Sequence, residues 1–249
     1  MNINKPIVSV VIPAYNEATY IGRLLTALSQ QKYDNFEVIV SDAGSHDGTD
    51  KVVASFKDRL AVAIVVSPPK GPGAGRNEGA KTARGEWLLF LDADDDIEGS
   101  NFISTLVSEA TMRGWQTATA KSKPKDAKWH ERIGSSINYR YIKFLARTKH
   151  PVAPGWCILT KRQLFEANGG FNSKIQFGED YDYVSRVGKQ GFGFVESTYY
   201  LVDQRRAREE GWRLAYKAIA NEIYRHTHGY NLEKNPYKYE FGKHKKKEQ

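Results

Sequence analysis

The stretch Trp87-Leu88-Leu89-Phe90-Leu91-Asp92-Ala93-Asp94-Asp95-Asp96 decides the fold of this chain. Its five leading apolar residues are typical of a short strand buried on both faces, as in the centre of a parallel sheet. Such a sheet presents ligand-binding groups at the carboxyl ends of its strands, and here four carboxylates follow the strand. Crowded carboxylates repel one another unless a cation or a proton offsets their charge, and oxygen ligands suit Mg²⁺ or Mn²⁺. The pattern indicates a metal site, with a polar turn that caps the next helix as the alternative.

Composition narrows the class of protein. A chain of 249 residues can form one large domain or two small ones. The single cysteine, Cys157, excludes an internal disulfide framework and fits a reducing compartment. No apolar stretch approaches the ~20 residues needed to cross a bilayer, and residues 1–17 lack a signal-peptide pattern. We therefore expect a cytoplasmic protein, with peripheral contact to the cytoplasmic face of the membrane left open.

The net charge of +8 is unevenly distributed along the chain. Residues 121–150 hold nine Lys and Arg against two acidic residues, and residues 238–249 hold five Lys against two Glu. Two basic regions on a near-neutral body suggest an anionic partner such as phosphate or a lipid surface. The alternative is a solvated basic face followed by a flexible tail, which is what we expect for residues 238–249.

Strands and helices alternate through the first part of the chain. Hydrophobic periodicity predicts four strands and three intervening helices. The strands are expected at 7–12, 36–40, 62–66 and 87–91, and the helices at about 18–31, 49–57 and 75–84. This alternation predicts βαβ units and therefore an α/β fold with a mostly parallel, Rossmann-like central sheet flanked by helices.

The second part of the chain is less regular. Helices are predicted at about 101–113, 133–147, 161–168, 179–190 and 208–227, strands at 115–120, 152–160 and 192–197, and a Lys-rich loop at 121–132. The last helix places Trp212, Tyr216, Ile219 and Ile223 along one side. Such a stripe fits a core or dimer face, and a basic amphipathic helix bearing Trp also fits an anionic lipid surface.

Five segments, in order, resemble family 2 glycosyltransferases with the GT-A fold. Residues 8–17 resemble the family's VSVVIPAYNE opening, residues 41–49 its DDGSxDGT, and residues 76–79 its RNxG. Asp92-Ala93-Asp94 resembles its D-x-D element, and Gly169-Gly170-Phe171 with Glu179-Asp180 its GGF…ED. The resemblance implies a single GT-A domain over 1–205, with a nucleotide-sugar half at about 1–96 and an acceptor half at about 97–205. Residues 206–249 would form a helical, basic C-terminal extension.

The resemblance implies the residues that bind the nucleotide. Asp42 would accept hydrogen bonds from the base, with Pro13, Tyr15 and Glu17 forming the rest of that pocket. An Asx turn is the alternative role for Asp42. Arg76 would lie near the nucleotide or its phosphates, and the alternative is a surface residue of a helix.

The D-x-D element would bind the rest of the donor. Within Asp92-Ala93-Asp94, the resemblance places Asp92 near the ribose and gives Asp94 the Mg²⁺ or Mn²⁺ that bridges the diphosphate. Asp95 could share the metal, and the sequence does not separate these two residues. The donor implied is a nucleotide-diphosphate sugar, a UDP sugar in particular.

The resemblance also implies the chemistry of transfer. Asp180 would be the general base of an inverting reaction, removing the proton from an acceptor hydroxyl on a glycan or a lipid-linked molecule. Glu179 would orient Asp180 or the acceptor. The alternative is that both acidic residues simply favour the N-terminus of a helix.

The region after residue 200 departs from the processive members of the family, which carry a Q-x-x-R-W element. The segment 204–208, Gln-Arg-Arg-Ala-Arg, matches this element only in part. Arg205 and Arg206 could close over the diphosphate as bidentate donors, or the segment could be a basic, mobile connector. Without that element and without membrane spans, we expect an enzyme that transfers one sugar.

Two other functions remain as alternatives. A nucleotidyltransferase on a related sheet should carry a Gly-rich loop after its first strand, and Pro13-Ala14-Tyr15-Asn16-Glu17 does not resemble one. A non-catalytic basic module that binds RNA or membrane would not need carboxylates at the ends of the strands. We expect no nucleic-acid partner, and the oligomeric state stays open.

Overall fold

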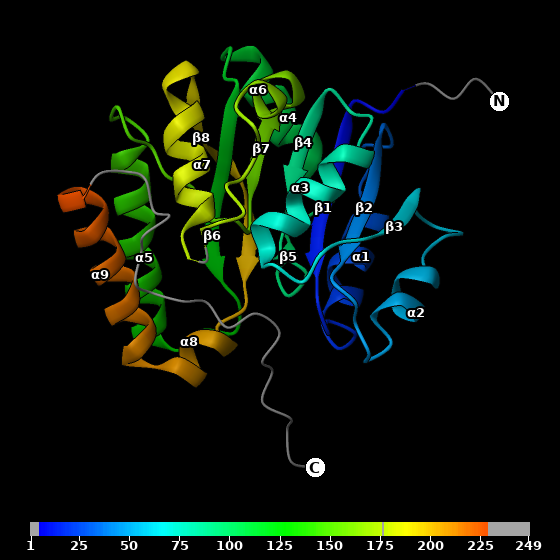
Figure 1. Ribbon diagram of the computed structural model, residues 1–249, viewed down its shortest axis with the longest axis horizontal. Coiled ribbons are helices and arrows are strands. Elements are labelled where there is room, and N and C mark those ends of the chain that lie inside the picture. Colours follow the sequence, from blue (N-terminus) through cyan, green and yellow to red (C-terminus); the bar gives the residue numbers. More distant parts are fainter. Residues whose placement is uncertain (1–4, 176, 229–249) are drawn as a thin grey trace.

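The computed structural model describes residues 5–175 and 177–228. Its strands join in one eight-stranded sheet in the order β3-β2-β1-β4-β7-β6-β8-β5 (Figure 1). The bounds are β1 Val8–Ala14, β2 Phe36–Asp42, β3 Val62–Val66, β4 Trp87–Phe90, β5 Asp96–Ile97, β6 Thr117–Pro124, β7 Ile158–Lys161 and β8 Phe192–Val202.

The sheet has a parallel part and a mixed part. Strand β1 lies between β2 and β4 and runs parallel to both, and β3 continues the parallel arrangement beside β2. Strand β7 then runs antiparallel to β4 and to β6. The α/β class is confirmed, and the pairing is parallel through β3-β2-β1-β4 and again between β6 and β8, which makes the sheet mixed.

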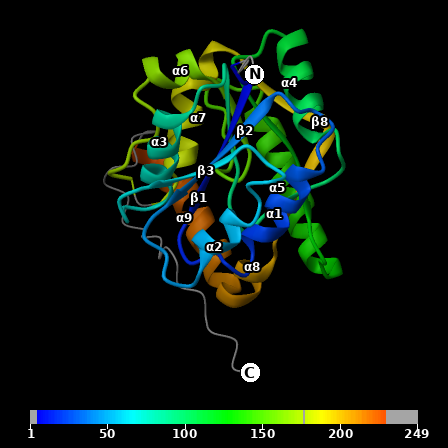
Figure 2. The same cartoon turned by 90° about the vertical axis from the view of Figure 1, so that its right-hand side faces the viewer.

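Helices cover both faces of this sheet (Figure 2). Their bounds are α1 Ile21–Ser29, α2 Thr49–Ala54, α3 Pro72–Thr82, α4 Phe102–Met112, α5 Trp129–Leu145, α6 Arg162–Ala167, α7 Glu179–Val187, α8 Arg205–Glu210 and α9 Trp212–His228. A short 3₁₀ turn, Gly188–Gln190, follows α7.

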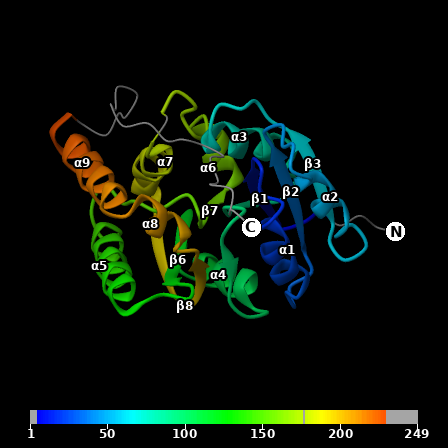
Figure 3. The same ribbon diagram turned by 90° about the horizontal axis from the view of Figure 1, so that it is seen from below.

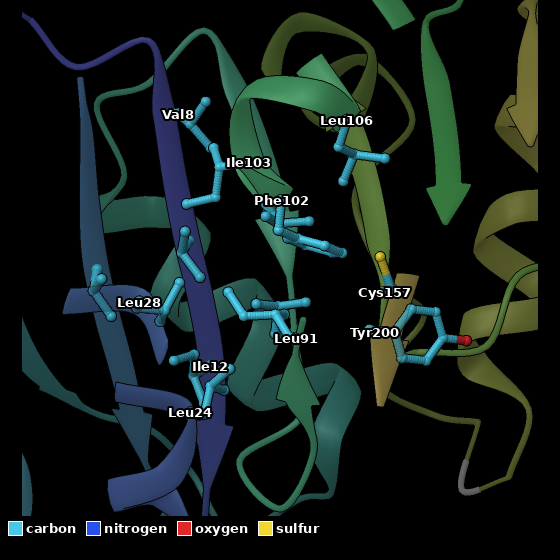
Figure 4. Close-up of a cluster of buried hydrophobic side chains, with 14 of the residues drawn as sticks. Val8, Ile12, Leu24, Leu28, Leu91, Phe102, Ile103, Leu106, Cys157 and Tyr200 are labelled. Carbon is cyan, nitrogen blue, oxygen red and sulfur yellow. The ribbon is translucent and has the colours of Figure 1, made fainter. Parts of the chain in front are cut away.

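Alternation along the buried strands divides the core into two layers. Val8, Val10 and Ile12 of β1 face α1 and α4, where Leu24, Leu28, Phe102 and Leu106 complete one cluster (Figure 4). Val11 of β1 and Phe90 of β4 face the other side, against residues of α3, α6 and α7. Because successive side chains of a strand point to opposite faces, a strand apolar at every position is buried on both sides.

Two predicted boundaries on the sheet are wrong. Residues 121–124 were expected in a loop but continue β6, where they pair with Tyr199–Val202 at the extended end of β8 after a register shift at Ala120/Lys121. Strand β7 begins at Ile158 instead of residue 152. Pairing with a neighbouring strand overrides the weak strand propensity of the Lys-rich segment.

The C-terminal helical region also differs from its prediction. The single helix expected over 208–227 is two helices, α8 and α9, separated by Gly211 at φ 54°. Helix α5 begins at Trp129, inside the predicted loop. No helix in the described ranges is long and apolar enough to span a bilayer. The predicted basic tail at 238–249 lies outside the described residues.

Candidate active site

The two loops that follow β1 and β2 are tied together by side-chain hydrogen bonds. The backbone N–H of Asn16 donates to Ser45 Oγ (2.9 Å), and Asn16 Oδ1 accepts the N–H of His46 (3.0 Å). The N–H of Ser45 donates to both oxygens of Asp42 (3.3 and 3.2 Å). Asp42 therefore forms the turn that was its alternative role. Base binding by Asp42, Pro13, Tyr15 and Glu17 stays a prediction.

The acidic stretch lies where β4 ends, beside the ends of β1 and β2. Asp92 accepts Nη2 of Arg76 on Oδ1 (2.7 Å), and Asp94 accepts Nη2 of Arg205 on Oδ2 (3.0 Å). Asp95 is 5% exposed and accepts the N–H of Asp203 (3.2 Å). Ala93 is buried between the two outward carboxylates. The three carboxylates Asp92, Asp94 and Asp95 thus have different partners.

Asp94 and Asp95 are held in an unfavourable electrostatic environment. Burial, reinforced by Glu17 and Asp92, raises the pKa of Asp94 to about 7, although Arg205 opposes the shift. Burial also raises the pKa of Asp95 well above its usual value, with Asp94 and Asp92 adding to the effect. A bound cation would relieve this repulsion.

The last of the four carboxylates, Asp96, has a structural role. It opens β5, and its Oδ2 pairs with Lys125 Nζ at 2.9 Å. Lys125 follows β6, so this pair joins the edge strand β5 to the end of β6 across the intervening β8. Asp96 therefore offers a matched control for its neighbours in functional tests.

Arg205 is attached to the acidic stretch from the far end of the chain. It is the first residue of α8, and its N–H is capped by Asp203 Oδ1 (2.8 Å). Its guanidinium stacks on the ring of Tyr20 (3.8 Å) while it pairs with Asp94. The segment is therefore helical, contrary to the alternative of a mobile connector. The side chain of Arg206 lies outside the described part of the chain.

Arg76 joins Asp92, which follows β4, to Glu179 at the start of α7. Its side chain is 2% exposed, with Nη2 on Asp92 and Nη1 donating to Glu179 Oε1 at 2.8 Å. Burial alone would lower the pKa of Arg76, but Asp92, Glu179 and Asp180 outweigh burial and raise it. The alternative of a surface helix residue is wrong. Contact of Arg76 with the nucleotide stays a prediction.

Asp180 lies at the start of α7, immediately after the buried Glu179. Its Oδ2 accepts the N–H of Gly155 (2.6 Å) and its Oδ1 the N–H of Tyr181 (2.8 Å). Burial and then Glu179 raise the pKa of Asp180 to about 7, against the effect of Arg76. A carboxyl group with this pKa can take up and release a proton near neutral pH.

The family model for glycosyl transferase family 2 matches residues 9–169 of this chain. The chain belongs to glycosyl transferase family 2. The matched segment includes Arg76 and Asp92-Ala93-Asp94 but ends before Asp180. The proposed base therefore rests on the geometry of α7 and on the GGF…ED pattern.

Relatives and solved structures are consistent with this family membership. Glycosyltransferase AglE of Haloferax volcanii is 39% identical over 203 residues, covering 78% of this chain and 66% of the relative. The mannosyltransferase PcManGT of Pyrobaculum calidifontis, solved with GDP-Man and Mn²⁺, superposes with a TM-score of 0.69 at 21% identity, covering 86% of this chain and 62% of that one. TarS of S. aureus, residues 1–349 with UDP-GlcNAc, gives a TM-score of 0.66 at 21% identity, covering 80% and 58%. These structures show a shared GT-A fold.

The chain spans about half the length of the first curated relatives it matches. The comparisons therefore show its family and fold. The donor, the acceptor and the reaction of the whole protein are matters for proposal.

The metal expected in this family 2 chain can be tested against its side chains. No group of three or more His, Cys, Asp and Glu side chains in the described ranges could hold a metal by itself. Mg²⁺ in nucleotide sites is usually bound by one or two carboxylates together with substrate phosphates, so a protein-only cage is not required. Burial first and neighbouring carboxylates second raise the pKa of Asp94 and Asp95, and a cation bound with the donor would stabilise their charged forms.

The sequence did not identify several residues that position the site. Gly155 lets the backbone approach Arg76 closely, because a Cβ there would lie 2.2 Å from Arg76 Nη2. Asn77 donates to the carbonyl of Phe171 (2.7 Å) and accepts its N–H (2.9 Å), which joins RNxG to GGF. Arg23 donates to the carbonyl of Asp94 (3.0 Å). Asn77 lay within a quoted motif, whereas Gly155 and Arg23 have no local signal.

Proposed function

We propose that this chain is a metal-dependent, inverting glycosyltransferase that moves one sugar from a UDP sugar to an acceptor hydroxyl. The observation that carries the proposal is the buried guanidinium of Arg76. It joins Asp92, at the donor-binding strand end, to Glu179, the neighbour of the proposed base. The guanidinium of Arg76 thus links Asp92, assigned to the donor, to Glu179, which lies beside the proposed base.

The donor would lie across the carboxyl ends of β1, β2 and β4. In an open α/β sheet, ligands bind there, at the point where the strand order reverses. Here that point lies between β1 and β4. Asp42 and Tyr15 would contact the base, and Asp92 the ribose. This arrangement supports the donor-binding roles implied by the family.

Asp94 would hold the Mg²⁺ or Mn²⁺ together with the donor's diphosphate. The bound metal would neutralise charge that develops on the leaving diphosphate. Asp95 already accepts the N–H of Asp203, and we assign it to fixing the segment before α8. Arg205 contacts Asp94 through Nη2, and its guanidinium would also donate to phosphate oxygens when the donor binds.

Asp180 would remove the proton from the acceptor hydroxyl. The hydroxyl oxygen then bonds to the anomeric carbon as the bond from that carbon to the diphosphate oxygen breaks and its electron pair leaves with the diphosphate. Attack from the face opposite the leaving group inverts the anomeric centre. Each Asp180 oxygen accepts one backbone N–H, which orients the carboxylate and leaves lone pairs for the proton.

Glu179 would act as a positioning residue. Its carboxylate is buried against Arg76, and a Cβ at Gly73 would lie only 2.9 Å from its Cγ. The close packing leaves Glu179 little freedom, so it fixes the start of α7 and with it the direction of Asp180. The acceptor would be a hydroxyl group of a glycan or of a lipid-linked molecule.

Metal-dependent binding of the nucleotide tests the donor half of the proposal. By isothermal titration calorimetry, we expect UDP to bind more tightly with Mn²⁺ present, and Asp94→Asn to lose most of this gain. Asp96→Asn removes a carboxylate from the same stretch and should bind like the wild type. GDP serves as the comparison for base preference. UDP binding that is indifferent to Mn²⁺ would contradict the role of Asp94.

A further inference from the structure

An exposed apolar surface runs along α5 and α9, which lie side by side at the end of the molecule farthest from α2 (Figure 1, Figure 3). We call it the apolar ridge. Its members are large hydrophobic side chains that are between 53% and 74% exposed: Trp129, Ile133, Ile137 and Phe144 on α5, and Tyr216, Ile219 and Ile223 on α9.

Helical spacing places each set on one outward face. On α5, the ridge residues follow one another at intervals of four and seven, whereas Ile142 and Leu145 bury the opposite face. On α9, Asn221 and Arg225 are buried beneath the helix while Ile219 and Ile223 point outward. Among the side chains of α9 that the structure describes, the polar Asn221 and Arg225 are thus buried while three large apolar residues are exposed.

Hydrogen bonds fix the orientation of α9 against α5. Tyr141 of α5 donates its hydroxyl to Glu222 Oε2 of α9 (2.7 Å), and Arg225 Nη2 donates to the same oxygen at 2.7 Å. Arg225 is 1% exposed and lies over the ring of Tyr181 (5.8 Å). Turning α9 to hide its apolar face would break this buried network.

The surroundings of the apolar ridge are basic. Arg132, Arg140 and Arg147 of the α5 region are exposed, as are Lys149 and Arg213. The acidic residues of the two helices are engaged elsewhere, since Glu131 pairs with Arg208 of α8 and Glu222 faces Tyr141. Exposed positive charge therefore flanks exposed apolar surface on both helices.

We propose that the apolar ridge docks on the surface of an anionic lipid bilayer. Amphipathic helices with Trp, Phe and Ile on one face and Arg or Lys beside it lie in the membrane interface. Anionic headgroups attract the flanking cations. A second copy of this chain is the less suitable occupant, because pairing two such faces would bring like charges together. The inference does not depend on the catalytic assignments.

Vesicle co-sedimentation of the full chain tests this inference. We expect binding to vesicles of equal parts phosphatidylcholine and phosphatidylglycerol to be about tenfold or more tighter than to phosphatidylcholine alone, and to weaken with added salt. The double variant Ile137→Glu/Ile219→Glu should lose about tenfold or more in affinity. Met112→Glu is the matched control, because Met112 is 79% exposed on α4, away from the ridge, and this variant should bind like the wild type.

Three results would overturn the proposal. The first is wild-type affinity in the double variant. The second is loss of binding when only Lys245, Lys246 and Lys247 are replaced by Ala, which would assign the membrane contact to the C-terminal residues. The third is a wild-type dimer, seen by light scattering, that Ile219→Glu dissociates, since the ridge would then be an interface between copies.

Discussion

Arg76 shows how one buried side chain can join distant parts of the chain at the candidate site. A guanidinium offers donors in a planar fork, and here two of its nitrogens reach carboxylates from distant parts of the chain. Removing one partner of a buried ion pair leaves the other charge uncompensated in a poorly solvated place. Arg76 should therefore matter more to stability than any exposed arginine of the chain.

Replacing Arg76 should destabilise the fold strongly. We expect Arg76→Ala to lower the free energy of unfolding by about 3–5 kcal/mol, because Glu179 would be left buried without its cation. Arg113→Ala is the control, since Arg113 is 60% exposed and pairs with Glu109 one helical turn away. Its loss should cost less than about 1 kcal/mol. Urea denaturation measures both, and equal effects would contradict the buried bridge.

The raised pKa of Asp180 should appear as a pH dependence of stability. The folded carboxyl group titrates at about 7, above its usual unfolded value of about 3.9, so the folded state binds more protons in between. Stability contributed by this group is therefore present at low pH and lost as the pH rises toward 7. Asp180→Asn should gain stability relative to the wild type as the pH is raised from about 4 to 8. A constant difference across that range would contradict the shifted pKa.

Among the elements, those with a strong apolar period could be predicted and those set by tertiary pairing could not. Strands β1 and β4 could be predicted from their continuous apolar runs, because both strands are buried on both faces of the sheet. The end of β6 carries Lys121, Lys123 and Pro124, and it is a strand only because β8 pairs with it. The division of α8 from α9 depends on the positive φ of Gly211. A single glycine within a helical pattern does not predict such a break.

The same contrast holds for the candidate site. The motif order along the chain pointed to Asp94, which follows β4, to Asp180, which lies at the start of α7, and to Arg76 within α3. Their partners could not be predicted, since Arg76 meets Glu179 across 103 positions and Arg205 meets Asp94 across 111. Such contacts depend on how the sheet halves pack, and local sequence carries no signal of it.

The loop before β7 should be intolerant of even one added methyl group. A Cβ at Gly155 would lie 2.2 Å from Arg76 Nη2 and would displace the guanidinium, so Gly155→Ala should destabilise the fold and weaken sugar transfer. Gly134→Ala is the matched control. Gly134 lies within α5 with nothing within 4 Å of an added Cβ, and alanine there should stabilise the helix by up to about 1 kcal/mol. Thermal unfolding of both variants measures the contrast, and similar shifts would contradict the tight approach.

At the scale of the whole molecule, the parallel part of the sheet carries the residues proposed to bind the donor, and α7 carries the proposed base Asp180. The two parts meet where β4 pairs antiparallel with β7. Helices α5 and α9 pack beyond the mixed part, where Arg225 of α9 contacts Tyr181, the residue after Asp180. Along the molecule, β1, α7 and the helix pair α5 and α9 follow one another (Figure 3).

The most direct test of the central claim separates donor binding from transfer in Asp180→Asn. After the wild type has been screened for a UDP sugar and an acceptor that it turns over, both quantities are measured on the variant. We expect UDP affinity within about twofold of the wild type and transfer lowered by about 10²–10⁴-fold, because the variant lacks only the general base. Asp94→Asn should lose both. Transfer at the wild-type rate by Asp180→Asn would contradict the account.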